Sequence, residues 1–166
     1  FELGKYGVYS ENKSGNTVKI TTCEIVGADT AVYLDSNINA TITNCRFQQN
    51  GLNSSYGDIY ALNCDRLSAI GNQSAASQGA FVYSYGNTQT IVSDNNVTQS
   101  YKDAIYFVGG SRNSIMNNNV VNFDSQNASS YSGIVLDTGE NNWLVSNNTV
   151  IGDENAPLNF GLYGLY

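Results

Sequence analysis

Two aspartates form the nearest approach to a catalytic pair in this chain. Asp58 and Asp103 each precede a run of alternating apolar residues, and the repeat described below places them two coils apart, about 10 Å. Hydrolysis of a glycosidic bond needs two carboxylates about 5–9.5 Å apart. Asp35 and Asp137 share a position in the repeat but lie four coils apart, roughly 19 Å. We interpret Asp58 and Asp103 as weak catalytic candidates, and as charges at a solvated edge in the simpler interpretation.

The sequence contains few residues that could carry out other kinds of catalysis. The chain has no histidine, which excludes every mechanism that needs imidazole. Its seven lysines and arginines are scattered over different coils and angles. Metal binding needs more convergent ligands than the sequence provides, so we expect no metal and no cofactor. The composition favours a protein without catalysis, but it leaves open a polysaccharide lyase or a glycoside hydrolase.

A row of tyrosines is the second feature that could have a function, because tyrosine side chains can bind a ligand or a partner. One outward position of the repeat carries tyrosine in five copies, interrupted by Val82 and Val135; the five are Tyr9, Tyr33, Tyr60, Tyr106 and Tyr163. Such a row can stack on sugar rings or bury against a partner protein. It can also pack only on itself and strengthen the sheet. The sequence leaves all three interpretations open.

A second outward column turns apolar in the later copies, with Ile91, Ile115 and Leu144. A row of exposed aliphatic side chains on a sheet is unusual for a monomer. We therefore expect this row to be covered by a neighbouring subunit or by the chain's own tail.

The chain also carries residues open to covalent modification. Seven asparagines stand in Asn-x-Ser/Thr sequons. Asn72 and Asn147 fall in predicted turns, where a structural role explains them, and the better acceptors for a glycan are Asn12, Asn53, Asn127, Asn39 and Asn96.

Of three cysteines, Cys23 and Cys45 occupy equal positions one coil apart. The strand spacing of about 4.8 Å falls in the range that a disulfide spans, so a bridge is one prediction and buried thiols are the other.

The positions given above for all of these residues follow from a repeat that runs through the whole chain. A short strand that begins with a small residue returns at spacings of 22 to 29 residues, from Gly7 to Gly161. A second strand and an Asn-rich turn follow it, and then a third strand. Such a period indicates a solenoid, and the period-two alternation within each run indicates strands. Stacked Asn amides can bond to one another at the turns. We expect an all-β, single-stranded right-handed parallel β-helix of about six coils.

The phrases Gly133 to Asn142 and Met116 to Val121 carry a resemblance to a known family. They resemble the right-handed parallel β-helix of the pectin-lyase-like superfamily, and within it the repeats of NosD-type surface and periplasmic proteins. The resemblance implies relatives among lyases, hydrolases, epimerases, phage tailspikes and adhesive surface proteins. It implies a fold and leaves the activity open, because one fold hosts many functions.

The length and the charge of the chain limit its domain organisation and its possible partners. The 166 residues fit one domain, 1–166, which we interpret as a β-helix that is a piece of a longer one or stacks on copies of itself. A net charge of −7 argues against a nucleic-acid partner, and no stretch is long enough to span a membrane. We expect a secreted, cell-surface or virion-surface structural or adhesive protein, with a filament subunit as the sharpest version. The alternative is a polysaccharide-binding or polysaccharide-degrading domain.

Overall fold

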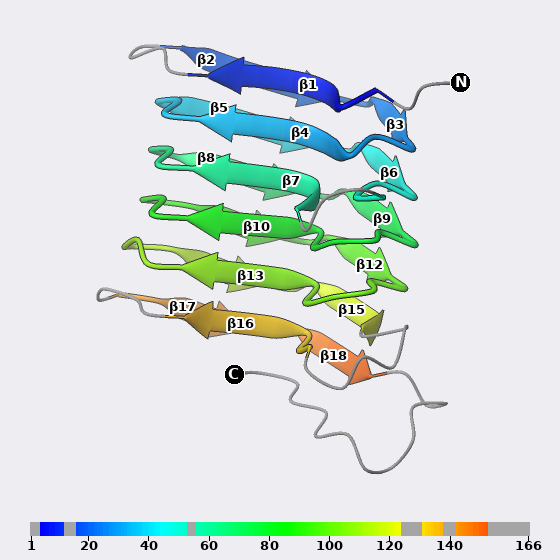
Figure 1. Ribbon diagram of the computed structural model, residues 1–166. Coiled ribbons are helices and arrows are strands. Elements are labelled where there is room, and N and C mark those ends of the chain that lie inside the picture. Colours follow the sequence, from blue (N-terminus) through cyan, green and yellow to red (C-terminus); the bar gives the residue numbers. More distant parts are fainter. Residues whose placement is uncertain (1–3, 12–15, 53–55, 124–130, 138–141, 153–166) are drawn as a thin grey trace.

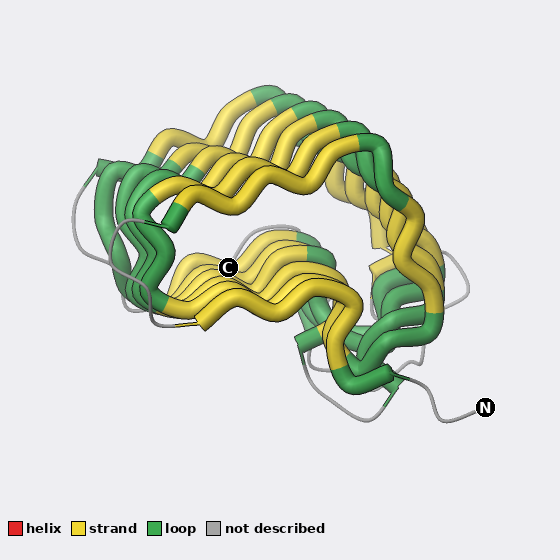
Figure 2. Tube along the Cα trace, turned by 90° about the horizontal axis from the view of Figure 1, so that it is seen from above, coloured by secondary structure: helices red, strands yellow, loops and turns green. Residues whose placement is uncertain are grey.

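The chain winds into three parallel sheets that run the length of the molecule. The computed structural model describes residues 4–11, 16–52, 56–123, 131–137 and 142–152. Each winding contributes one strand to each sheet, and the windings stack in chain order (Figure 1). The predicted all-β solenoid of about six coils is confirmed. Viewed along the axis, successive windings superimpose (Figure 2).

The three sheets each hold six strands in parallel register. The first sheet comprises β1 (Tyr6–Glu11), β4 (Thr30–Asp35), β7 (Gly57–Leu62), β10 (Val82–Tyr85), β13 (Ile105–Val108) and β16 (Ile134–Asp137). The second comprises β2 (Thr17–Thr21), β5 (Asn39–Thr43), β8 (Leu67–Ile70), β11 (Ile91–Ser93), β14 (Ser114–Met116) and β17 (Leu144–Ser146). The third comprises β3 (Glu24–Val26), β6 (Arg46–Gln48), β9 (Gln73–Ala75), β12 (Asn96–Thr98), β15 (Asn119–Phe123) and β18 (Thr149–Gly152).

The core is a set of columns of apolar side chains that point into the solenoid. One column on the first sheet runs through Val32, Ile59, Val82, Ile105 and Ile134, all of them buried. Burying one such side chain contributes about 1.5–3 kcal/mol relative to leaving it exposed. The columns exist because parallel register puts like positions of successive coils on top of one another.

An asparagine ladder closes the turn between the second and third sheets. The amide nitrogen of Asn72 donates to Asn95 Oδ1 (3.1 Å), Asn95 donates to Asn118 (2.9 Å), and Asn118 donates to Asn148 (2.9 Å). Each of these amides also donates to a backbone carbonyl of the preceding coil, as Asn95 does to Ala69. The predicted stacking of Asn amides is therefore confirmed, and it satisfies polar groups that water does not reach.

The ladder asparagines occupy the second turn position, so the sequence alignment was wrong by one residue in two coils. The first turn position has a left-handed backbone, with φ of 67° at Gly71 and 55° at Asn117. Alignment of the repeats on their Asn-rich turns places Asn72 and Asn118 at that position instead. The shift moves Ile115 from the outer face to the core, where it is buried and pairs with Val92 and Val145.

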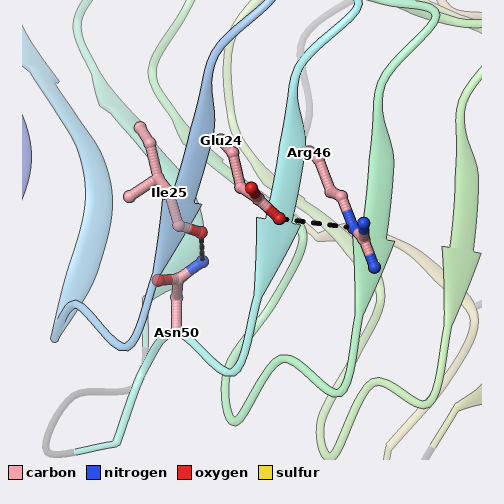
Figure 3. Close-up of polar contacts among 4 residues, drawn as sticks. All are labelled: Glu24, Ile25, Arg46 and Asn50. Carbon is pink, nitrogen blue, oxygen red and sulfur yellow. Dashed lines mark hydrogen bonds and ion pairs between the residues drawn. The ribbon is translucent and has the colours of Figure 1, made fainter.

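Polar contacts between neighbouring coils on the outer surface are weaker than those of the buried asparagine ladder. Glu24 and Arg46 form an ion pair (3.7 Å) between β3 and β6 on the exposed face of the third sheet (Figure 3). Nearby, the Asn50 amide nitrogen donates to the Ile25 carbonyl (3.1 Å), which ties the corner of the second coil to the first. An exposed pair such as Glu24–Arg46 contributes about 0–1 kcal/mol.

Candidate functional site: a tyrosine ladder on the first sheet

Five tyrosine rings stack in an unbroken row on the outer face of the first sheet. Tyr9, Tyr33, Tyr60, Tyr83 and Tyr106 are register partners on successive strands. The distances between consecutive ring centroids are 5.0, 5.2, 5.4 and 5.0 Å. We name these five residues the tyrosine ladder. The stacking follows from the fold, because the parallel register repeats every outward position at the spacing of the strands.

Tyr83 was missing from the predicted row, where Val82 stood in its place. The structure has Val82 buried in the core and Tyr83 in register with Tyr60. The error has a structural cause at the corner before β10. Phe81 is fully buried and occupies the position that Ala31 and Ala104 hold in other coils, so no small residue marks the start of this strand. Val135 does follow Tyr106 in register, as expected. Tyr163 lies outside the described residues.

Two further rings widen the surface beside the ladder. Tyr6 lies 4.8 Å from Tyr9 and 5.2 Å from Tyr33, measured between ring centroids. Exposed Tyr56 lies 4.0 Å from Tyr60 and 5.5 Å from Tyr83. These two rings were not part of the predicted row, because neither stands in the column that contains Tyr9 and Tyr33. Together with the ladder they form a broad aromatic surface.

The ladder phenols stay protonated at neutral pH. A hydrogen bond from the Tyr9 hydroxyl to Glu11 raises the pKa of Tyr9 to about 12. Burial, followed by a hydrogen bond to Asp137 (3.0 Å), raises the pKa of Tyr106 to about 12. Burial also raises the pKa of Tyr60. These phenols can donate and accept hydrogen bonds, but they are poor bases near pH 7.

A pocket of about 240 Å³ opens beside the last two ladder rings, Tyr83 and Tyr106. Its other lining residues are Ala80, Lys102, Asp103 and Tyr131. Asp103 accepts a hydrogen bond from the backbone nitrogen of Ser132 (2.6 Å), two residues before β16. The pocket therefore combines aromatic walls with a cation and a carboxylate.

The two candidate aspartates are not brought together. Asp58 is fully buried inside the solenoid, where it accepts hydrogen bonds from Asn50 (2.8 Å) and Ser74. Burial raises its pKa to about 7. Asp103 lines the pocket on the outer side. The interpretation of Asp58 as a solvated edge charge was wrong, because the first three residues of β7 are all buried and Asp58 is the second of them.

The predicted apolar row is interrupted. Ile91 and Leu144 are exposed and lie on either side of Ser114 in register. Ile115, which we had placed in this row, is in the core. Ile91 instead lines a groove on the second sheet.

The sequon asparagines differ in exposure. Asn96 is exposed on β12, and Asn39 is partly exposed on β5. Asn72 is buried in the asparagine ladder, where a structural role was expected. Asn12, Asn53 and Asn127 lie outside the described residues.

All three cysteines are free thiols in the structure, so the predicted bridge between Cys23 and Cys45 is not formed in it. Cys23 is exposed and Cys45 is buried at the equivalent turn of the next coil. Burial raises the pKa of Cys45, which lowers its reactivity as a nucleophile. Cys45 Sγ donates to the Thr43 carbonyl (3.3 Å).

Within the described residues, no cluster of three or more His, Cys, Asp or Glu side chains has the arrangement of a metal site. The same part of the chain contains no helix with the length and apolar character of a membrane span.

Comparison with known proteins agrees with this architecture. Residues 6–163 match the family described as the right-handed β-helix region. No curated protein and no solved structure matches the chain. The match covers nearly all of the sequence, and the chain belongs to the right-handed β-helix family.

Proposed function

We propose that this protein is a non-catalytic extracellular β-helix that adheres to a glycan through its tyrosine ladder. One observation carries the proposal: five rings stand in contact along the solenoid axis on one outer face. A row of partly exposed rings fits an extended glycan chain, because rings that stack on one another offer apolar ring edges and hydroxyl groups along the outer face. The pocket at Tyr83 and Tyr106 would hold one end of such a chain.

The chemistry of the same face supports binding without catalysis. Asp58 is sealed in the core, so it cannot act with Asp103 on a bound glycan. The phenols of Tyr9 and Tyr106, with pKa values near 12, remain donors where a lyase would need a base. A neutral polysaccharide is the ligand class we propose, since Glu11, Asp35 and Asp137 line the next column of the same sheet and disfavour anions there.

The test is retention of the purified protein on an array of neutral polysaccharides. We expect the protein to be retained on at least one of them, and we expect Tyr33→Ala and Tyr60→Ala to lose that retention. Val26→Ala, which truncates an exposed side chain on the third sheet, is the matched control and should bind normally. Release of reducing ends or unsaturated products from the array would contradict the non-catalytic part of the proposal.

Assembly of copies end to end is a second candidate function. Among the described strands, β1, β2 and β3 have a neighbour on one side only, and so do β16, β17 and β18. Such edges can pair with another chain, and a head-to-tail contact repeats into a filament. Light scattering at high protein concentration tests this, because a protein that stays monomeric is not a filament subunit. If Tyr33→Ala and Tyr60→Ala abolish assembly and leave glycan retention intact, the ladder is a protein contact.

The extracellular location is part of the same proposal. Exposed sequons such as Asn96 are expected in a protein that passes through a glycosylating secretory route and stands on a cell or virion surface.

A further inference from the structure

The asparagine ladder begins at the third coil, and cysteines hold the equivalent position in the first two coils. The backbone nitrogen of Cys45 donates to Asn72 Oδ1 (2.9 Å), as the backbone nitrogen of each ladder residue donates to the next. The carbonyl of Cys23 accepts from the Arg46 nitrogen (2.8 Å), as that of Cys45 accepts from the Gln73 nitrogen (2.9 Å). Cys23, Cys45 and Asn72 therefore occupy the same position of successive coils.

A thiol at this position cannot repeat the bonds that an asparagine makes. The Asn72 amide nitrogen donates both to the Ile42 carbonyl (2.9 Å) and to Asn95 Oδ1 (3.1 Å). The Cys45 thiol instead donates to the Thr43 carbonyl of its own coil, and sulfur is a weak hydrogen-bond acceptor. The amide link that joins the later coils therefore has no counterpart in the described turns of the first two coils.

The two cysteines lie in matched backbone settings. Thr22 and Asn44, which precede them, both have a left-handed backbone, with φ of 54° and 52°. Each thiol donates to the carbonyl two residues before it, at 3.3 Å. The residues that follow, Glu24 and Arg46, pair in register across β3 and β6 (Figure 3). Equivalent residues of neighbouring parallel strands are about 4.8 Å apart, within the Cα separation of about 4.4–6.8 Å that a disulfide spans.

The two sulfur atoms differ in exposure, which gives an oxidant one point of entry. Cys23 is exposed and Cys45 is buried. Burial raises the pKa of the Cys45 thiol, and a hydrogen bond from the backbone of Cys23 acts in the opposite direction. The Cys45 sulfur therefore lies against the backbone of Cys23. The third cysteine, Cys64, lies at the corner between the first and second sheets, where its backbone nitrogen donates to Asn87.

We propose that Cys23 and Cys45 form a reversible disulfide that fastens the first coil to the second in an oxidising environment. The oxidant is a small-molecule disulfide. The Cys23 thiolate attacks it, binds one half and releases the other half as a thiol. The Cys45 thiolate then attacks Cys23 Sγ and displaces the bound half. The protons of the two cysteines leave on the two released thiols, so two protein thiols are oxidised and one small disulfide is reduced.

The cross-link acts at the end of the described solenoid, where the coils have the least support. Among the described strands, β1, β2 and β3 have a neighbour on one side only, and a coil depends on its neighbours for stability. The disulfide closes a loop between residues 22 positions apart and so restricts the opened state of this coil. Because β1 carries Tyr6 and Tyr9, the redox state decides how firmly this end of the aromatic surface is held.

The experiment treats the full chain with oxidised glutathione and counts free thiols by alkylation and mass spectrometry. We expect the three free thiols to fall to one, and peptide mapping to join Cys23 to Cys45. Hydrogen exchange should slow about tenfold or more in β2 and β3, and stay unchanged in β14 and β15.

Three variants separate this bridge from general oxidation of thiols. Cys23→Ala changes an exposed residue and Cys45→Ala a buried one, and each should abolish both the bridge and the slower exchange. Cys64→Ala is the matched control and should keep both. Because Cys23→Ala removes no buried group, it decides the question even where Cys45→Ala lowers stability.

Four results would overturn the proposal. Three are chemical: all thiols stay free, glutathione stays on Cys23 as a mixed disulfide, or Cys23 joins two copies of the chain. The fourth is formation of the bridge with unchanged exchange in β2 and β3, which would remove its stabilising role. Retention of the reduced protein on a neutral polysaccharide is a separate measurement, so either proposal can fail while the other stands.

Discussion

The hydroxyl of Ser74 donates a hydrogen bond to Asp58 Oδ2 inside the third coil, where both side chains are buried. Ser74 pairs in register with Phe47 on one side and Val97 on the other. Asp58 precedes Ile59, as the buried Phe81 precedes Val82 in the next coil. Both polar residues thus replace apolar ones in their columns, and Asn50 supplies a second donor to the carboxyl group (2.8 Å).

This buried carboxyl group predicts that stability falls as the pH rises. Burial raises the pKa of Asp58 from its ordinary value of 3.8 to about 7. Between these values the folded chain holds a proton that the unfolded chain has lost, so unfolding becomes easier as the pH increases. The contribution of the protonated Asp58 carboxyl group to the unfolding free energy is complete below pH 3.8 and is lost as the pH passes 7. It amounts to about 4 kcal/mol at most.

Denaturant unfolding at a series of pH values checks this prediction. Asp58→Asn keeps the size of the side chain and removes its titration. We expect the difference in unfolding free energy between variant and wild type to grow in favour of the variant from pH 4 to pH 8. Parallel curves for the two proteins would show that Asp58 does not titrate in this range.

The tyrosine ladder should contribute to stability as well as to binding. Tyr60 contacts the rings of Tyr33, Tyr56 and Tyr83, and aromatic pairs contribute about 0.5–1.5 kcal/mol each. We expect Tyr60→Ala to lower the unfolding free energy by about 2–4 kcal/mol. Tyr60→Phe keeps the ring and should cost less than about 1 kcal/mol. An equal loss in both variants would mean that the hydroxyl, and not the stacking, is responsible.

The asparagine ladder predicts a sharp contrast between two neighbouring residues. Asn95 donates to Ala69 O and Asn118 Oδ1 and accepts from Asn72 in a buried site. Asn95→Ala leaves several buried groups unpaired and should cost about 2–4 kcal/mol. Asn96 is exposed one residue later, and Asn96→Ala should cost less than about 1 kcal/mol. Thermal unfolding of the two variants measures the contrast, and similar melting temperatures would contradict it.

The same burial predicts which sequons can carry a glycan. In protein secreted from eukaryotic cells, we expect Asn96 to be modified and Asn72 to be unmodified, because folding buries both amide atoms of Asn72. Peptide mapping by mass spectrometry measures the occupancy of each site. A glycan on Asn72 in folded protein would be incompatible with the asparagine ladder.

The repeat could be predicted from the sequence because inward and outward residues recur at equivalent positions of each coil. Its exact register was not. Gly71 and Asn117 take the left-handed turn position, but Asn72 and Asn118 look like equally good turn residues in the sequence. Choosing them moved Ile115 to the wrong face. At the corner before β10, Phe81 replaces the small residue found in other coils, and this hid Tyr83 from the predicted row.

The burial of Asp58 could not be predicted for a different reason. Alternation predicts that every second residue of a strand is buried, whereas the first three residues of β7, Gly57 to Ile59, are all buried. The partners of Asp58 come from a separate corner and from β9. The groove on the second sheet was equally hidden, because it joins Arg66 and Arg112 from two separate turns. Both features depend on which residues of neighbouring coils meet at the corners, and the repeat in the sequence does not specify this.

One comparison tests the tyrosine ladder as a glycan-binding surface most directly. Tyr83 lies in the ladder, whereas Tyr85 is exposed two residues later on β10, in the neighbouring column with Leu62 and Val108. Calorimetric titration with the neutral polysaccharide retained on the array should show that Tyr83→Ala lowers the affinity about tenfold or more. Tyr85→Ala should bind almost as tightly as the wild type. Equal affinity of Tyr83→Ala and the wild type would contradict the proposal that this row of rings holds the glycan.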